Sequence, residues 1–180
     1  MRNAPTNRDD IIYSRDVIAR IEELTDERDA LQEAIDEAQT ALVDALKAVE
    51  ALAEYDDNDD DDETQAAFDD AQAAFDEAEQ ALSEALAALE DWKTEEGGEL
   101  AELETLAASA SAYASDWLYG VQLISESYFT EYAQQLAEDC YDMKDANVWP
   151  FTCIDWEAAA GELKTDYTTV DFGGTAYYVR

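Results

Sequence analysis

The 180-residue sequence contains no histidine, and only 10 lysines and arginines stand against 46 aspartates and glutamates. Histidine is the commonest general base and the commonest metal ligand in proteins, so its absence leaves any catalysis to carboxylates, cysteine or lysine. The formal net charge of −36 repels nucleic acid and anionic membranes and attracts basic surfaces. The shortage of bases therefore argues against direct nucleic-acid binding and favours a basic protein as partner.

Recognisable catalytic and cofactor motifs are also missing. The sequence has no glycine-rich phosphate loop, CxxC pair or nucleophile elbow. The acidic run at residues 56–63 invites a calcium interpretation, but it lacks the glycine that an EF-hand loop requires. We therefore expect neither an enzyme nor a bound cofactor or dedicated metal site.

Long apolar runs are absent as well. Residues 1–5 carry no apolar core of a signal peptide, and no window approaches 18 apolar residues. The sequence predicts a protein without a membrane span, located in the cytoplasm. Cys140 and Cys153 are the two cysteines; without a secretory signal, such a pair usually stays reduced, so we expect no disulfide.

An apolar pattern typical of helices occupies the first half of the chain. From Val17 to Leu52, apolar residues or alanines recur in alternating steps of four and three, interrupted only by Arg28. A second series runs from Phe68 to Trp92. The strongly acidic segment 55–63 separates the two series and predicts a loop. We expect an antiparallel hairpin in which Arg28 pairs with an acid from the facing helix or the C-terminal part and sets the register.

The flanking residues complete the expected fold. Residues 1–8 are expected to fray, with Asn7 or Asp9 capping the first helix. The pair Gly97-Gly98 predicts the end of the second long helix. A shorter helix should follow, with Leu100, Leu103 and Leu106 on one face.

The composition changes near residue 116, where aromatic residues become frequent. Helices are expected at about 120–139 and 155–164, followed by a β-hairpin of residues 167–172 and 175–179. The Gly173-Gly174 pair between these strands suits a primed two-residue turn. The overall prediction is a mostly α protein: a long antiparallel helical (coiled-coil) hairpin at 9–96, followed at 99–180 by a helical connector and a compact, aromatic-rich α+β domain ending in a β-hairpin.

The aromatic residues of this second domain are not expected to stack on nucleic-acid bases, because stacking platforms are accompanied by lysine and arginine. They are better explained as a core and a self-association surface. We expect a homodimer. The residues predicted to mediate it are Tyr128, Tyr132, Trp149 and Trp156.

The charge density of the hairpin suggests a function. Residues 29–92 hold 22 acids and the single base Lys47. Two helices of about 25 to 30 residues span about 40 to 45 Å, which gives about one net charge per 2 Å. Duplex DNA carries about one charge per 1.7 Å. The hypothesis is an acidic DNA mimic that inhibits a basic, DNA-binding protein. The carboxylates expected to contact this partner are Asp29, Glu33, Asp36, Glu37, Asp44, Asp56, Asp57, Asp59, Asp60, Asp61, Asp62, Glu63, Asp69, Asp70, Asp76, Glu77 and Glu84.

The C-terminal third adds a resemblance to a known family. The order Tyr132-Ala133, Glu138, residues 154–158 (Ile-Asp-Trp-Glu-Ala), Leu163 and a terminal aromatic strand resembles the C-terminal domain of ArdA-type antirestriction proteins. The family's Gly-Arg pair falls here on Ala160-Gly161, and the acidic hairpin has no counterpart in it. The resemblance implies a phage or mobile-element protein that mimics bent duplex DNA, dimerises, and occupies the DNA groove of type I restriction-modification enzymes.

A different class of function stays open. The alternative is an acidic coiled-coil structural or assembly protein, whose solvated helix charges would fit a high-salt source. The charge is uneven, however: residues 29–92 have 22 acids and one base, whereas residues 116–180 have 12 acids and three bases. Adaptation to salt would tend to spread the charge evenly. This contrast favours the mimic.

Overall fold

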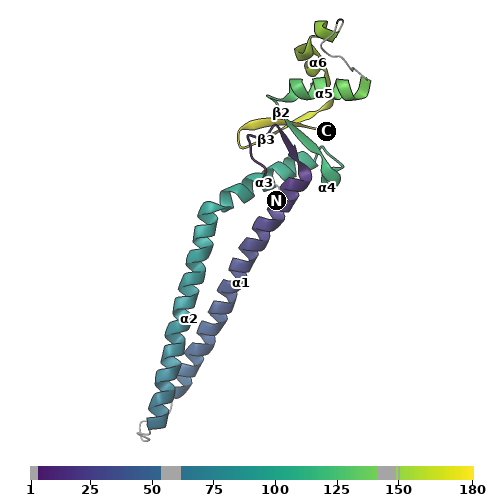
Figure 1. Ribbon diagram of the computed structural model, residues 1–180. Coiled ribbons are helices and arrows are strands. Elements are labelled where there is room, and N and C mark those ends of the chain that lie inside the picture. Colours follow the sequence, from purple (N-terminus) through teal and green to yellow (C-terminus); the bar gives the residue numbers. More distant parts are fainter. Residues whose placement is uncertain (1–3, 54–61, 142–148, 150) are drawn as a thin grey trace. The chain divides into compact units, whose positions relative to one another are not determined.

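The computed structural model describes residues 4–53, 62–141, 149 and 151–180. The protein is mostly helical, as predicted, and it has one small four-stranded antiparallel sheet, of which only the C-terminal hairpin was predicted (Figure 1). The chain divides into two compact units. We call residues 24–98 the helical unit, and residues 1–23 with 99–180 the sheet unit.

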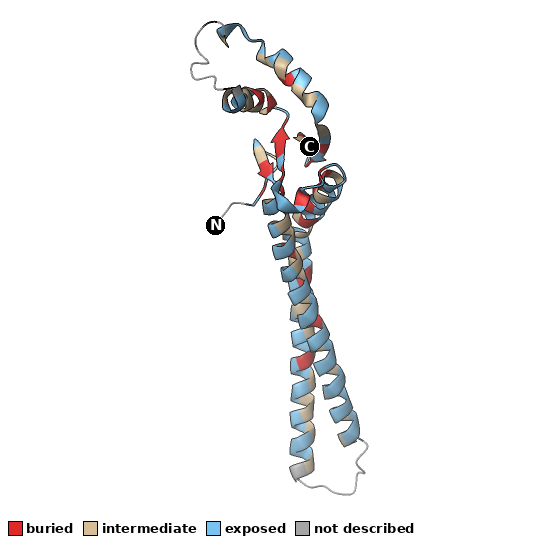
Figure 2. Ribbon diagram, turned by 90° about the vertical axis from the view of Figure 1, so that its right-hand side faces the viewer, coloured by how far each residue is buried: buried red, intermediate tan, exposed pale blue. Residues whose placement is uncertain are grey.

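The helical unit contains most of α1 (Ser14–Ala53) and all of α2 (Asp62–Glu95). The two helices run in opposite directions along each other in both views (Figures 1 and 2). Trp92 links them, because its Nε1–H donates to Glu27 Oε2 at 3.3 Å. The segment 54–61, where the loop was predicted, lies outside the described residues. Helix α2 begins at Asp62, inside the run expected to be a loop, since acids are favoured in a first helical turn.

Shielded side chains in the helical unit follow the predicted spacing. In α1, every position from Leu24 to Leu52 that is not exposed fits the alternation of three and four, apart from Thr25. In α2 the same alternation continues from Thr64 to Trp92, with Gln72 as the one addition. Ile35 at 3% and Leu89 at 8% exposure are among its best buried residues. The apolar series thus coincides with the positions of both helices that are not exposed.

The sheet unit is built around strands β1 (Ile11–Tyr13), β2 (Gln122–Ser125), β3 (Thr168–Phe172) and β4 (Thr175–Val179). Their spatial order is β1-β2-β4-β3, and all neighbours are antiparallel. The C-terminal hairpin is confirmed. Gly173 and Gly174 have φ values of 55° and 82°, in the left-handed region that a type I′ turn requires.

Strands β1 and β2 correct the sequence prediction. Residues 122–125 were expected to be helical, and residues 11–13 were expected to lie within or next to the first helix. Instead, Ile12 pairs with Leu123 across more than a hundred residues of chain. Strands of three and four residues are too short to show a period of two, so their identity depends on this distant pairing.

Helices complete the sheet unit. These are α3 (Gly97–Ser111, of which the unit holds residues 99–111), α4 (Trp117–Gly120), α5 (Phe129–Tyr141) and α6 (Trp156–Leu163), with 3₁₀ turns at Phe151–Cys153 and Lys164–Asp166. The predicted apolar face of α3 is confirmed, since Leu100, Leu103 and Leu106 are buried.

Both faces of the sheet are buried in part. On one face, Ile124 packs in a cluster with Phe129 and Ala133 of α5 and Ala160 of α6. Residues Leu123 and Tyr177 point to the opposite face, and both have no exposed surface. Figure 2 shows this concentration of buried residues in the sheet unit.

The N-terminal segment is ordered against the C-terminal hairpin, which corrects the expectation of fraying for residues 4–8. Asn7 Nδ2 donates to the Gly173 carbonyl at 2.7 Å, and Thr175 Oγ1 donates to the Asn7 carbonyl at 2.9 Å. Tyr177 donates its hydroxyl proton to the Asp9 carbonyl at 2.8 Å. Neither Asn7 nor Asp9 caps α1; Asp9 instead accepts from the Thr6 amide at 2.7 Å.

Candidate acidic interaction surface

The described carboxylates named as partner contacts are all exposed. On α1 they are Asp29, Glu33, Asp36, Glu37 and Asp44, and on α2 they are Asp69, Asp70, Asp76, Glu77 and Glu84. None occupies the shielded positions that recur every three and four residues. The acidic side chains therefore lie on the solvent-facing surfaces of both helices, away from the apolar series.

Glutamines orient four of these carboxylates. Gln65 donates to Asp69 at 2.8 Å, Gln72 to Asp76 at 3.0 Å and Gln80 to Glu84 at 2.8 Å, each across four residues of α2. On α1, Gln32 donates to Asp36 at 3.2 Å. A glutamine four residues before an acid is a helix-stabilising pair. The spacing of these pairs is visible in the sequence.

The bases of the helical unit bind acids of their own helix. Lys47 contacts Asp44 at 2.9 Å, and Lys93 contacts Glu90 at 2.7 Å. Arg28 contacts its neighbour Asp29 at 2.8 Å, which corrects the expectation that it pairs across the hairpin. Arg28 occupies a half-buried position of the shielded series and pairs with the exposed carboxylate of the next residue. Each base thus neutralises an acid locally, and most carboxylates of the unit keep their charge uncompensated.

The remaining predicted contacts lie outside the described part. Asp56, Asp57, Asp59, Asp60 and Asp61 belong to the segment 54–61, and only the backbone of Asp62 and Glu63 is described, in the first turn of α2. The calcium interpretation concerns this same run, most of which lies outside the described residues. Among the residues that the structure describes, no group of three or more acids or cysteines is placed to hold a metal ion.

Uncharged residues separate the acids. Alanines recur every seven residues at Ala34, Ala41 and Ala48 of α1, and at positions 67, 74, 81 and 88 of α2, and all are exposed. Three larger apolar side chains are also exposed: Val43 at 50%, Leu46 at 43% and Leu86 at 45%. The helical unit is therefore not uniformly acidic around its circumference.

The residues predicted for self-association belong to the sheet unit. Tyr128 and Tyr132 are half-buried and pack against the cluster around Phe129. The hydroxyl of Tyr132 lies 3.1 Å from that of Tyr167, and Gln135 donates to the Tyr128 hydroxyl at 2.7 Å. Trp156 is half-buried at the start of α6, whereas Trp149 is 78% exposed.

Asp155 has a structural role. Its Oδ1 accepts a hydrogen bond from the Ala158 amide at 3.0 Å, so it caps α6. Cys140 and Cys153 are both free and exposed. Neither observation builds a catalytic centre.

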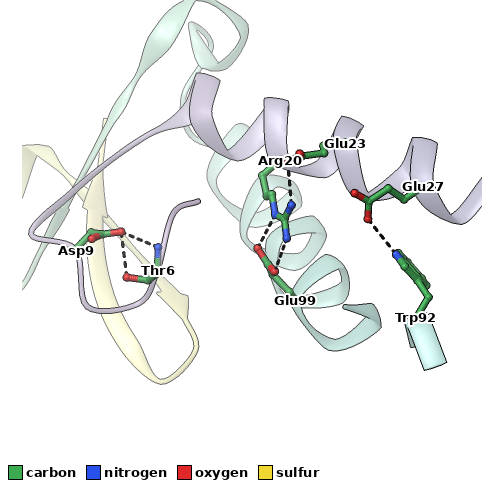
Figure 3. A network of polar contacts seen from close by, with 7 residues as sticks. All are labelled: Thr6, Asp9, Arg20, Glu23, Glu27, Trp92 and Glu99. Carbon is green, nitrogen blue, oxygen red and sulfur yellow. Dashed lines mark hydrogen bonds and ion pairs between the residues drawn. The ribbon is translucent and has the colours of Figure 1, made fainter. Parts of the chain in front are cut away.

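A polar network fixes the start of α3 within the sheet unit. The guanidinium of Arg20 donates through Nε and Nη2 to the two carboxylate oxygens of Glu99, at 2.9 and 3.0 Å (Figure 3). Its Nη1 contacts Glu23 at 2.9 Å. These bonds raise the pKa of Arg20 above its usual value, mainly through Glu99. A bidentate pair of this kind sets an orientation as well as contributing energy.

No protein family, curated protein or solved structure matches the chain. The described residues include no helix long and apolar enough to span a membrane.

Proposed function

We propose that the helical unit is an electrostatic mimic of DNA, which inhibits a host defence enzyme by occupying its DNA-binding groove. The observation that carries this proposal is the exposure of the carboxylates along α1 and α2, together with bases that bind only acids of their own helix. A basic groove would meet many carboxylates and little competing positive charge.

The length of the helices suits a groove. With 34 residues, α2 extends over about 51 Å at 1.5 Å per residue. In the proposal, α1 and α2 pack as an antiparallel coiled coil through the shielded series that includes Ile35, Ala78 and Leu89. This packing keeps the acids at fixed spacings, so binding does not have to order a disordered acidic chain.

The proposed partner is a basic DNA-binding protein or complex of the host, and neither nucleic acid nor membrane is contacted directly. The resemblance to ArdA-type proteins suggests a restriction-modification enzyme, a phage or mobile-element origin, and action in the host cytoplasm. Counterions bound to the partner's basic groove would be released on binding, so the affinity should fall as salt rises.

A competition experiment tests the proposal directly. The full chain would be immobilised, incubated with host lysate at low salt, and the retained proteins identified. DNA binding by a retained protein should then be lost at near-stoichiometric amounts of this chain, and excess duplex should displace the chain. Simultaneous binding of duplex and this chain to the partner would contradict mimicry.

Charge variants locate the contact. Five carboxylates of α2 would be neutralised together: Asp69, Asp70, Asp76, Glu77 and Glu84. Inhibition should weaken strongly, with a flatter salt dependence, whereas Glu84→Gln alone should cost well under 1 kcal/mol of binding free energy, because such charges contribute similar small increments. A matched control neutralises five exposed acids of the sheet unit: Glu102, Glu104, Asp116, Glu131 and Asp139. Equal losses from both blocks would argue against a specific role for the helical unit.

A second function is favoured by the uncharged part of the same helices. The exposed alanine series and the exposed Val43, Leu46 and Leu86 could pack against further helices, as in an acidic coiled-coil assembly protein. This alternative predicts that Leu46→Gln combined with Leu86→Gln reduces self-association measured by light scattering, and that the chain does not compete with DNA. The mimic instead predicts that neutralising the five-carboxylate block weakens DNA competition and leaves self-association unchanged.

A further inference from the structure

The C-terminal hairpin leaves backbone hydrogen-bonding groups free at the edge of the sheet. The Glu126 amide donates to the Ala176 carbonyl at 2.9 Å, so Ala176 and Tyr178 direct their backbone groups toward β2. Val170 and Phe172 therefore exchange hydrogen bonds with their partners on β4. The alternate residues of β3, Thr169 and Asp171, direct N–H and C=O outward. Within the described chain, these four groups have no hydrogen-bond partner.

The other edge of the sheet is protected by its construction. Strand β1 has only three residues, follows the acidic pair Asp9-Asp10, and runs directly into α1 at Ser14. Short edge strands and charges are the usual ways in which proteins block pairing between sheets. Strand β3 is longer, with five residues, and has no lysine, proline or bulge.

The one charge on β3 is already engaged. Asp171 Oδ1 accepts a hydrogen bond from the Gly174 amide at 3.2 Å, as part of the turn. Thr169 is exposed and uncharged. The edge therefore repels a second strand only in a register that places the two Asp171 carboxylates opposite each other.

We infer that β3 pairs with β3 of a second copy of this chain, in an antiparallel arrangement that joins two four-stranded sheets. A two-fold axis through Val170 places Thr169 opposite Asp171 of the second copy, and Asp171 opposite its Thr169. Both are pairs whose free groups face each other, so each exchanges two hydrogen bonds. One surface patch thus meets itself, as two-fold symmetry requires.

The alternative registers are less favourable. Setting Asp171 opposite Asp171 of the second copy brings like charges together, which destabilises a strand pair. Setting Thr169 opposite Thr169 brings Asp171 opposite Tyr167 of the second copy, and the Tyr167 amide is already bonded to the Lys164 carbonyl at 3.1 Å. The register centred on Val170 avoids both problems. It does not use the acidic surface of α1 and α2, so it stands independently of the proposed function.

Sedimentation of the full chain over a range of concentrations tests the pairing, in 0.5 M NaCl to screen the net charge of −36. We expect a concentration-dependent dimer. Thr169→Pro removes an outward N–H without removing a bond to β4, and should weaken dimerisation at least tenfold. The matched control, Thr169→Val, keeps the N–H and the β-branched shape and should dimerise like the parent.

A measurement on the unaltered chain covers the case in which the proline variant misfolds. Amide exchange of Thr169 and Asp171 should slow as the dimer forms, whereas Ile11 and Tyr13 on the β1 edge should not change. A monomer at high micromolar concentration, protection at the β1 edge instead, or a dimer unaffected by Thr169→Pro would each overturn the inference. Higher salt should strengthen this dimer and weaken binding to a basic partner, so the two proposals fail separately.

Discussion

The helical unit and the sheet unit bury apolar surface in different ways. Helices α1 and α2 shield one narrow series of positions, and nearly every other side chain on them is exposed. The sheet unit instead buries large side chains on both sides of a sheet, among them Leu123, Phe129 and Tyr177. Charge repulsion opposes a larger share of the burial energy in the helical unit. The stability of the helical unit should therefore depend on salt concentration. The stability of the sheet unit should depend more on the size of its buried side chains.

Removing a core aromatic ring should have the largest effect. Phe129 has no exposed surface, and its ring lies 4.8 to 5.6 Å from those of Tyr132, Tyr167 and Tyr178. Phe129→Ala should lower the free energy of unfolding of the sheet unit by about 3 to 5 kcal/mol, measured by urea titration with near-ultraviolet circular dichroism. Leu118→Ala, at a side chain 72% exposed, is the control and should be nearly neutral.

The corresponding change in the helical unit should cost less. Ile35 is 3% exposed, but it belongs to a thin apolar series. Ile35→Ala should lower the free energy of unfolding by about 2 kcal/mol, the low end for such a truncation, seen as lost ellipticity at 222 nm. The control is Val43→Ala, at an exposed position of the same helix. If Ile35→Ala lowered the free energy of unfolding as much as Phe129→Ala does, the helical unit would have a deeper core than its burial pattern indicates.

A buried serine joins the start of α1 to the sheet. Ser14 Oγ donates to the Trp117 carbonyl at 2.7 Å and accepts from the Val121 amide at 2.8 Å, and the side chain has no exposed surface. Ser14→Ala leaves both groups unpaired, so it should cost about 1 to 3 kcal/mol. Thermal unfolding of Ser14→Ala, compared with the exposed control Ser111→Ala, measures this loss of stability. Equal unfolding midpoints for the two variants would contradict the expectation.

Alkaline pH should destabilise the sheet unit before the helical unit. Burial raises the pKa of Tyr177 to about 12, with nearby Asp9 and Asp10 adding to the effect, and burial also raises the pKa of Tyr167. Tyrosine in the unfolded chain titrates near 10. The folded state therefore holds more protons between about pH 10 and 12, and its stability falls as pH rises through that range. Tyr177→Phe should make the loss of stability with rising pH less steep. Near-ultraviolet circular dichroism of the parent and the variant measures this loss.

Salt should produce the smallest difference. Raising NaCl from 50 mM to 1 M shortens the screening length to about 3 Å, which reduces repulsion among the exposed acids of α1 and α2. The midpoint of unfolding at 222 nm should rise by a few degrees. Neutralising Asp69, Asp70, Asp76, Glu77 and Glu84 should reduce that rise, whereas Phe129→Ala should leave it unchanged. If salt raised only the midpoint seen in the near-ultraviolet signal, the sheet unit and not the helical unit would be the part that responds to salt.

The sequence by itself determined the features that depend on local patterns. The alternation of three and four located the shielded positions of α1 and α2, the leucines at 100, 103 and 106 marked the buried face of α3, and Gly173-Gly174 specified the hairpin turn. The acids of the candidate surface followed as well, because residues off an apolar series face solvent. The physical reason is that helical periodicity and turn conformation are properties of neighbouring residues.

Tertiary structure alone decided what depends on distant partners. It made strands of Ile11–Tyr13 and Gln122–Ser125, ordered the N-terminal segment against the hairpin through Asn7, and gave Ser14 two buried partners beyond residue 116. It also turned Arg28 toward Asp29 and left the edge of β3 open. These segments are too short to carry a period, and an isolated strand gains its hydrogen bonds only when a remote segment arrives beside it.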